Sequence, residues 1–265
     1  MRIIITGAAS GIGRAAAHLM AAKSLARGES PRLMLADVAE KPLEEAAREV
    51  RALGAEAEIH VGDLAEPQTC AEIVRRAGAA FGGLDVLVSN AGIISDAPLL
   101  DLTLEDYERM FAINTRATWL LAKAAFPMLR DSRGCIVATC SLAAHDPTPG
   151  RGAYAPSKAA LLMLVRQLAN EWGRYGIRCN SISPGTTLTS IGREPASAKA
   201  TPGLAGLNPL GVMSMPEDQA AAIAFLASPE ARFIHGADLV VDGGTQTELM
   251  SVFDPARMAA ATPRP

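Results

Sequence analysis

Short apolar runs alternate with longer amphipathic segments along almost the whole chain. Runs of apolar and β-branched residues predict strands at residues 2–6, 32–36, 58–61, 84–89, 134–140, 177–183 and 238–241. Segments with apolar residues at every third or fourth position predict helices at residues 12–26, 41–53, 67–81, 104–129, 152–175 and 216–227. Strands that alternate with helices of this length form βαβ units. We therefore expect an α/β protein with a parallel sheet of about seven strands and helices on both faces, in three α/β/α layers.

Two segments interrupt this alternation. Residues 186–215 are rich in Gly, Pro, Ser and Thr, and so long a connection in a compact protein is usually functional or disordered, so we expect a lid over a substrate. Residues 259–265 form a polar, proline-containing end that is expected to be flexible. Because no linker-like stretch divides the middle of the chain, residues 1–265 are expected to form a single domain.

A glycine-rich turn follows the first predicted strand. Residues 6–13 read TGAASGIG and lead directly into the first predicted helix. Glycine permits positive φ angles and a close approach to a ligand, and the helix start offers N–H groups and a positive dipole end to a pyrophosphate. Three glycines alone are a weak signal, but their place between a strand and a helix strengthens it. The turn predicts a dinucleotide site at Gly7, Ser10, Gly11, Ile12 and Gly13.

Asp37 and Val38 follow the second predicted strand. A carboxylate at this position would accept hydrogen bonds from both hydroxyls of the adenosine ribose and repel a 2′-phosphate. NAD is therefore the expected cofactor, in preference to NADP. A capping or solvent-exposed role for Asp37 is the alternative.

Polar and small residues also end the next two predicted strands. They are Asp63 and Leu64 after the third strand, and Asn90, Ala91 and Gly92 after the fourth. Ligands of open α/β sheets bind at the carboxyl ends of the strands, so all five residues are expected beside the cofactor. An Asn at such a position can equally tie its own loop together.

Four polar residues form a candidate catalytic centre. Tyr154 and Lys158 are four residues apart in a predicted helix, so they share one face. The ordinary pKa of a phenol is about 10, and a nearby ammonium lowers it, so this pair can donate a proton to an alkoxide or remove one from an alcohol. Ser141 follows the fifth strand, where its hydroxyl can hold the substrate oxygen, and Asn114 lies inside a predicted helix, which disfavours Asn. Each residue alone is commonplace, and only their combination after a dinucleotide turn indicates catalysis.

Composition narrows the classes of function. The net charge is −3 and the Lys and Arg residues are scattered among acids, which disfavours a nucleic-acid partner. No apolar run is long enough to predict a membrane span, and the chain starts directly with a strand, so we expect a cytoplasmic protein with no membrane partner. The cysteines include no CxxC pair and no Cys/His cluster, so buried reduced thiols and no metal are expected at Cys70, Cys135, Cys140 and Cys179.

Taken together, these motifs resemble the short-chain dehydrogenase/reductase family in its compact, NAD-preferring form, over residues 2–244. The shared motifs are TGxxxGIG at 6–13, NAG at 90–92, Asn114, Ser141, YxxxK at 154–158, and Pro184-Gly185 followed by Thr189. The resemblance implies a Rossmann-type doubly wound fold. One departure is Ser89, which replaces the Asn that usually begins the NNAG motif. Members that prefer NADP often carry a basic residue where this chain has Ser10 or Val38, in agreement with Asp37.

The resemblance also implies a role for each site residue. Tyr154 is the expected general acid and base, while Lys158 lowers its pKa and holds the nicotinamide ribose. Ser141 orients and polarises the substrate carbonyl, and Asn114 positions a water in a proton relay behind Lys158. The residues expected at the nicotinamide end are Pro184, Gly185, Thr187 and Thr189.

The expected function is an oxidoreductase that interconverts a secondary alcohol and a ketone by hydride transfer. Residues 93–98, 142–150 and the lid should line the substrate pocket, with His145 as a packing or surface residue or, as the minor alternative, a substrate contact. The apolar residues of the lid favour a hydrophobic or cyclic substrate, such as a hydroxysteroid: Leu188, Ile191, Leu204, Leu207, Leu210 and Met213. In relatives, the region matching residues 225–244 packs against another subunit, so a homotetramer or dimer is expected.

Two other functions are the alternatives to an oxidoreductase. A catalytically idle nucleotide-binding scaffold of the same fold would usually lack Tyr or Lys, and both Tyr154 and Lys158 are present. A non-redox lyase of the same fold would lack the cofactor glycines, which are also present. Consumption of NADH, as opposed to its binding, distinguishes these alternatives from an oxidoreductase.

Overall fold

The computed structural model describes residues 1–189 and 208–248. In this part of the chain, seven parallel strands form one sheet in the order β3-β2-β1-β4-β5-β6-β7. The strands are β1 (Arg2–Thr6), β2 (Arg32–Asp37), β3 (Glu56–Val61), β4 (Val86–Ser89), β5 (Cys135–Thr139), β6 (Arg178–Pro184) and β7 (Asp238–Val241). The main helices are α1 (Gly11–Ala26), α2 (Glu40–Ala52), α3 (Pro67–Phe81), α4 (Leu104–Phe111), α5 (Ala117–Ser132), α6 (Tyr154–Trp172) and α7 (Pro216–Ala227). The expected Rossmann-type architecture is confirmed.

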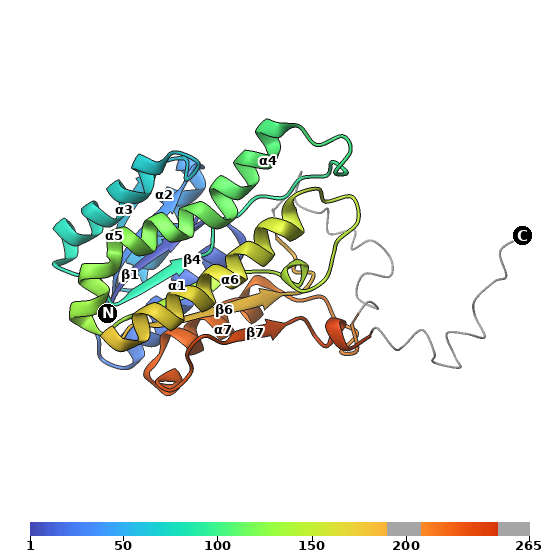
Figure 1. Ribbon diagram of the computed structural model, residues 1–265. Coiled ribbons are helices and arrows are strands. Elements are labelled where there is room, and N and C mark those ends of the chain that lie inside the picture. Colours follow the sequence, from blue (N-terminus) through green and yellow to red (C-terminus); the bar gives the residue numbers. More distant parts are fainter. Residues whose placement is uncertain (190–207, 249–265) are drawn as a thin grey trace, which may run out of the picture.

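Helices cover both faces of the sheet (Figure 1). Helices α1, α2 and α7 pack on one face, and α3, α5 and α6 pack on the other. Successive side chains of a strand point to opposite faces, so Ile3 and Ile5 enter the first core while Ile4 enters the second. This arrangement explains why the central strands are continuous apolar runs and do not alternate with polar residues.

The strand order reverses between β1 and β4. The chain first builds outward from β1 through β2 to β3 and then returns to place β4 on the other side of β1, with Ile3 beside Val86 and Ile5 beside Val88. The connections that leave the carboxyl ends of these two strands therefore diverge to opposite sides. Ligands of open α/β sheets bind in the crevice at such a switch point.

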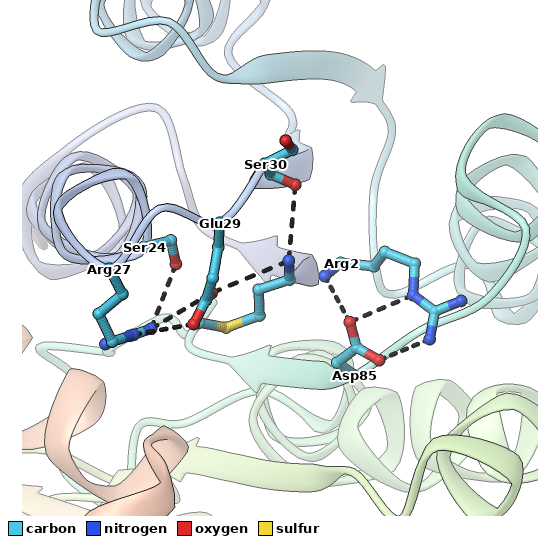
Figure 2. A network of polar contacts seen from close by, with 7 residues as sticks. Arg2, Ser24, Arg27, Glu29, Ser30 and Asp85 are labelled. Atoms are coloured by element: carbon cyan, nitrogen blue, oxygen red, sulfur yellow. Dashed lines mark hydrogen bonds and ion pairs between the residues drawn. The ribbon is translucent and has the colours of Figure 1, made fainter.

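Arg2 and Asp85 hold together the opposite, amino-terminal ends of β1 and β4 (Figure 2). The Arg2 main-chain N–H donates to Asp85 Oδ2 at 2.7 Å, and its guanidinium donates to both carboxylate oxygens, at 3.1 and 2.6 Å. The terminal amine of Met1 donates to the Ser30 carbonyl at 3.5 Å in the same network. The contacts between Arg2 and Asp85 align β1 with β4, the two strands whose carboxyl ends form the switch point.

Two predicted helices differ from the structure. The single helix predicted over residues 104–129 is wrong in its middle, where the π-helical turn η1 (Ala112–Arg116) separates α4 from α5. A π turn adds a residue to a helical turn and often occurs at functional sites. The helix predicted from residue 152 begins at Tyr154, because Gly152 has a φ of 50°, which does not fit a helix, and the 3₁₀ turn η3 (Gly173–Tyr175) follows its end.

Most of the predicted lid, residues 190–207, lies outside the described residues, as does the predicted tail at 259–265. The described ends of the lid lie side by side, because Thr187 and Ser214 form a parallel β-bridge and the Leu188 N–H donates to the Ser214 carbonyl at 3.0 Å. Among the described helices, none is both long and apolar enough to cross a membrane.

Candidate active site

A cavity of about 610 Å³ lies at the carboxyl ends of the strands. The predicted residues that line it are Gly7, Ser10, Gly11, Ile12, Asp37, Val38, Asp63, Leu64, Asn90, Ala91, Gly92, Ser141, Tyr154, Lys158, Pro184, Gly185, Thr187 and Thr189. Two predicted residues, Gly13 and Asn114, do not line the cavity. The fold thus brings residues from across the sequence to one place.

The glycine turn packs too closely for side chains. Gly7 has a φ of 66°, and a Cβ on Gly13 would lie 2.1 Å from the Gly7 carbonyl oxygen. Gly13 therefore lets the first turn of α1 approach β1 directly, although it does not line the cavity. Across the cavity, Thr189 packs against Gly11, since a Cβ there would lie 3.2 Å from Thr189 Cγ2. The turn and the start of α1 form a cradle that fits a dinucleotide pyrophosphate.

The Asp37 carboxylate is fixed at the edge of the cavity. It accepts hydrogen bonds from the main-chain N–H groups of Ala9, in the glycine turn, and Ala39, both at 3.1 Å. A carboxylate has about four acceptor positions, so further positions remain for ribose hydroxyls. Val38 beside it is exposed and adds no positive charge that could attract a 2′-phosphate.

The Asn90 side chain connects the carboxyl ends of β1, β4 and β5 by hydrogen bonds. Its Nδ2 donates to the carbonyl of Thr6 at 3.1 Å, and its Oδ1 accepts from Thr139 Oγ1 at 3.0 Å. The Thr6 hydroxyl accepts in turn from the N–H groups of Asn90 and Ala91, at 3.0 and 3.1 Å. These side-chain contacts reach β1 and β5 and not the loop of Asn90 itself, and Asn90 also lines the cavity. Sequence reasoning missed Thr6 and Thr139, because a threonine in a strand carries no signal of such a role.

Asp63 at the cavity wall is paired with Arg109 of α4, a residue that sequence reasoning missed. The two side chains lie 2.8 Å apart, and Arg109 also lines the cavity. Burial acts to raise the pKa of Asp63, but the N–H of Ala65 and the Arg109 guanidinium outweigh it and lower this pKa. A charge pair therefore lies where the third strand meets the cavity, although its two partners are 46 residues apart in sequence.

The side chains of Tyr154, Lys158 and Ser141 line the same cavity. Lys158 is only 3% exposed, and its Nζ donates to the Thr139 carbonyl at 2.8 Å. The same Nζ lies 5.9 Å from the centroid of the Tyr154 ring. Ser141 begins the 3₁₀ turn η2 (Leu142–Ala144) and its Oγ accepts from the Ala143 N–H at 3.1 Å, which leaves its own hydrogen available to a ligand.

Asn114 lies in the π turn η1, and its hydrogen bonds hold the segments next to Tyr154 and Lys158. The side chain is 1% exposed; its Oδ1 accepts from the Ile93 N–H at 2.8 Å, and its Nδ2 donates to the Ile93 carbonyl and to Ser157 Oγ, both at 3.0 Å. Ser157, which sequence reasoning missed, donates to the Tyr154 carbonyl at 2.7 Å. Asn114 thus joins the loop after β4 to the first turn of α6, which explains an Asn inside a helical segment.

His145 does not line the cavity. Its Nε2 lies 2.8 Å from Asp238 Oδ2 and 3.3 Å from Ser183 Oγ, so it packs the turn after Ser141 against β6 and β7. The packing alternative for His145 therefore agrees with its contacts.

The four cysteines are buried thiols, as predicted. Burial raises the pKa of Cys140 to about 12, although the nearby Lys158 charge acts to lower it, so this thiol next to Ser141 stays protonated at neutral pH. Within residues 1–189 and 208–248, no group of three or more His, Cys, Asp and Glu side chains could hold a metal ion.

The sheet order, the glycine cradle and the Tyr154–Lys158 pair define a dinucleotide-binding oxidoreductase fold. A family model described as enoyl-(acyl carrier protein) reductase matches residues 7–246. The L-rhamnose 1-dehydrogenase (NAD(P)(+)) of Sphingomonas sp. (strain SKA58) is 38% identical over 256 residues, which cover 93% of this chain and 96% of that protein. The chain belongs to the short-chain dehydrogenase/reductase family.

Two further relatives agree with this assignment. The D-threitol dehydrogenase of Mycolicibacterium smegmatis is 37% identical over 248 residues, which cover 91% of each chain. The crystal structure of a dehydrogenase/reductase from Sinorhizobium meliloti 1021 superimposes with a TM-score of 0.83 at 33% identity, covering 92% of this chain and 94% of that one. Sequence and fold thus agree over nearly the full length of these relatives.

Proposed function

We propose that this protein is an NAD(H)-dependent alcohol dehydrogenase that interconverts a secondary alcohol and a ketone. The observation that carries the proposal is the presence of Ser141, Tyr154 and Lys158 in one cavity with the glycine cradle. The names of the relatives support it, since one is an L-rhamnose 1-dehydrogenase and another a D-threitol dehydrogenase.

Each catalytic side chain has a distinct role in this proposal. A bound nicotinamide, held beside Pro184, Gly185, Thr187 and Thr189, would supply the hydride acceptor for oxidation of the carbinol carbon and the hydride donor for reduction of the carbonyl carbon. The phenolate of Tyr154 takes the hydroxyl proton as the carbon–oxygen double bond forms, and the phenol returns it in the opposite direction. The Lys158 ammonium lies beside the Tyr154 ring, with its Nζ 5.9 Å from the ring centroid, and the Ser141 hydroxyl donates to the substrate oxygen. Asn114 holds the first turn of α6, which carries Tyr154 and Lys158, against the loop after β4.

The proposed preference for NAD rests on Asp37. Its carboxylate is held by the N–H groups of Ala9 and Ala39 and would repel a 2′-phosphate. In this proposal Gly7, Ser10, Gly11 and Ile12 contact the pyrophosphate, while Gly13 lets α1 pack closely against the turn. Pro184, Gly185, Thr187 and Thr189 would lie at the nicotinamide.

The cavity supports a substrate with both apolar and polar parts. Ile93, Ile94 and Leu142 line it together with Thr148 and Arg151. The apolar members agree with the cyclic skeleton expected from the sequence, whereas Thr148 and Arg151 favour additional polar groups. We therefore propose a cyclic or polyhydroxylated secondary alcohol. The lid residues Ile191, Leu204 and Leu207, which first suggested a hydrophobic substrate, lie outside the described residues.

We also propose that the protein forms a homotetramer or a dimer. Support comes from large apolar side chains exposed in the region 225–244, including Phe233, which is 99% exposed, and the partly exposed Phe225 and Leu239. Such exposed apolar groups mark interaction surfaces when they are contiguous. Sedimentation velocity of the purified chain tests this proposal, and a monomer at micromolar concentration would contradict it.

The activity is tested by absorbance at the nicotinamide band. Purified protein receives NAD or NADP with a panel of secondary alcohols, and NADH or NADPH with the matching ketones, beside the variants Tyr154→Phe and Tyr175→Phe. We expect turnover that falls at least about 100-fold in Tyr154→Phe and is retained in Tyr175→Phe, whose hydroxyl pairs with Arg174 outside the cavity. Binding of NADH without turnover of any alcohol or ketone would favour the idle scaffold, and turnover only with NADP(H) would contradict the role of Asp37.

A further inference from the structure

Ser157 is a buried hydroxyl residue in the first turn of α6, between Tyr154 and Lys158. Residues three apart on a helix share one face, so Ser157 lies on the face of Tyr154 and directly precedes Lys158. Ser157 is 0% exposed and does not line the cavity, whereas Tyr154 and Lys158 do. It therefore contacts no molecule held in the cavity, and its effect on the chemistry passes through its neighbours.

The Ser157 hydroxyl is used both as a donor and as an acceptor. It donates to the Tyr154 carbonyl at 2.7 Å and accepts from Asn114 Nδ2 at 3.0 Å. The Ser157 carbonyl accepts in addition from Thr115 Oγ1 at 2.8 Å. Asn114 and Thr115 are neighbours in η1, so this π turn holds one residue of α6 by two side chains. Two such contacts limit both the translation and the rotation of the first turn of α6 relative to η1.

The same contacts extend to the amine of Lys158. Asn114 Oδ1 accepts from the Ile93 N–H at 2.8 Å, so Asn114 is held by the loop after β4. A Cβ on Gly92 would lie 3.2 Å from both Asn114 Oδ1 and Lys158 Nζ, so the amine and the amide lie close to the same point of that loop. Because a packed interior leaves little free space, a shift of Ser157 would displace the amine of the residue that follows it.

Helix stability does not explain a serine at this position. Ala has a higher helix propensity than Ser, and a hydroxyl that bonds back to a helix carbonyl adds little stability. Ser132 in α5 makes a comparable bond to the Leu129 carbonyl at 3.3 Å and another to the Leu84 carbonyl at 2.6 Å, but it does not line the cavity. Ser157 differs from Ser132 because it also accepts from the Asn114 side chain, and Ser132 is therefore a matched control.

We propose that Ser157 is a positioning residue for the dehydrogenase reaction, an inference that rests on the proposed function. Its hydroxyl connects η1 to the Tyr154 carbonyl and thereby keeps the Tyr154 hydroxyl and the Lys158 ammonium in place beside Ser141. Ser157 transfers no proton and contacts neither substrate nor cofactor. Without its hydroxyl, one N–H of Asn114 loses its acceptor in a buried place, so η1 and α6 shift relative to each other.

Steady-state kinetics with NAD and a secondary alcohol that the wild type oxidises test this role. The variants are Ser157→Ala, Ser157→Thr, Ser157→Val and the control Ser132→Ala. Thr and Val have nearly the same size and branching, so their comparison separates the hydroxyl from the added methyl group. The kcat and both KM values are measured for each variant. Fluorescence titration with NADH and thermal unfolding establish that each variant is folded and binds the cofactor.

We expect Ser157→Ala to lower kcat about 10- to 100-fold, because a small displacement of reacting groups slows the chemical step. The KM values for NAD and the alcohol should stay within about twofold of the wild type, since no binding contact is removed. Ser157→Thr should keep a kcat at least about fivefold above that of Ser157→Val, the worth of one hydrogen bond. Ser132→Ala should keep the wild-type kcat even if its unfolding midpoint falls as far as that of Ser157→Ala.

Four results would overturn the inference. An unchanged kcat in Ser157→Ala would leave the hydroxyl with a structural role only, and equal kcat values in Ser157→Thr and Ser157→Val would assign the loss to packing. An equal loss of kcat in Ser132→Ala would show a general effect of destabilisation. A higher KM for NAD with kcat retained would assign Ser157 to cofactor binding.

In each of these cases the wild type oxidises an alcohol, so the proposed function stands. Absence of turnover in the wild type with every alcohol and ketone contradicts the proposed function itself, and the inference with it.

Discussion

The imidazole Nε2 of His145 lies 2.8 Å from Oδ2 of Asp238, a residue 93 positions further along the chain. The Asp238 side chain is 4% exposed and also accepts hydrogen bonds from the hydroxyls of Ser181 at 2.5 Å and Ser183 at 2.7 Å. One buried carboxylate therefore joins the turn after Ser141 to β6 and β7. Ser183 directly precedes Pro184 and Gly185, so the same contacts support two walls of the cavity.

Replacement of this carboxylate should destabilise the protein. In Asp238→Ala, three donors lose their acceptor in a buried place, and we expect the free energy of unfolding to fall by about 2–4 kcal/mol. Urea unfolding followed by circular dichroism measures the change. The control Asp146→Ala removes an exposed carboxyl near the same turn and should change this free energy by less than about 0.5 kcal/mol. Equal losses in both variants would contradict the structural role of Asp238.

The Arg2–Asp85 pair predicts how stability depends on pH. Burial acts to raise the pKa of Asp85, but the hydrogen bonds from the Arg2 guanidinium and N–H, with the Arg2 charge, outweigh it and hold this pKa below its ordinary value of 3.8. Because the folded-state pKa is the lower one, the stabilisation is complete above pH 3.8 and is lost as the pH falls through the folded-state pKa.

Asp85→Asn should therefore weaken the loss of stability in acid. We expect the free energy of unfolding to fall by about 2 kcal/mol at pH 7 and to decline less steeply than in the wild type below about pH 4. Urea unfolding at a series of pH values from 7 to 3 measures the free energy of unfolding at pH 7 and its decline in acid, for the variant and for the wild type. The control Asp131→Asn alters a more exposed ion pair with Arg130 and should leave the slope nearly unchanged. If the free energy of unfolding declined as steeply with falling pH in Asp85→Asn as in the wild type, the Asp85 carboxylate would make no contribution to the loss of stability in acid.

Asp37 should set the cofactor preference. In Asp37→Ser, the carboxylate that would accept from the ribose and repel a 2′-phosphate is removed. We expect the ratio of kcat/KM with NAD to kcat/KM with NADP to fall at least about tenfold. Loss of the acceptor for Ala9 should raise KM for both cofactors, so the ratio is the informative quantity. Glu40→Ser, an exposed carboxylate at the start of α2, is the control, and a similar shift there would show a general effect of charge.

Gly92 should be required for the position of Lys158. A Cβ on Gly92 would lie 3.2 Å from both Lys158 Nζ and Asn114 Oδ1, and both of those side chains are buried. Gly92→Ala should displace the amine and lower kcat about 10- to 100-fold. In the control Gly78→Ala, the new Cβ would meet the flexible end of Met128 at 3.1 Å, far from the cavity, so kcat should be retained. Equal kcat in Gly92→Ala and the wild type would show that the amine has room to move.

The local pattern along the chain was sufficient to predict most of the fold. Ile3, Ile4 and Ile5 form a continuous apolar run because the strand is covered on both faces, and TGAASGIG predicts the turn because Gly13 leaves no space for a Cβ. The pattern was misleading at residues 104–129. A helix and a π turn show nearly the same apolar spacing, so the pattern does not register the residue that is added within Ala112–Arg116.

The candidate site also contains residues that a local sequence pattern predicts and residues that it does not. Ser141, Tyr154 and Lys158 could be proposed as site residues from their types and spacing, since a Tyr and a Lys four residues apart share one helix face. Arg109, Thr139 and Ser157 show no such pattern. Their partners are Asp63, Lys158 and Asn114, between 19 and 46 residues away, and no local pattern encodes contacts at that separation.

By itself, the sequence determined the parallel α/β class and was enough to propose the dinucleotide turn and the main reacting groups, because each depends on neighbours within one turn or one strand. Only the tertiary structure decided the pairings of His145 with Asp238 and of Arg151 with Asp96. A parallel sheet collects the carboxyl ends of all its strands at one edge, so the loops that meet there come from distant parts of the chain. Which side chains touch at that edge depends on the order of the strands and the path of each loop.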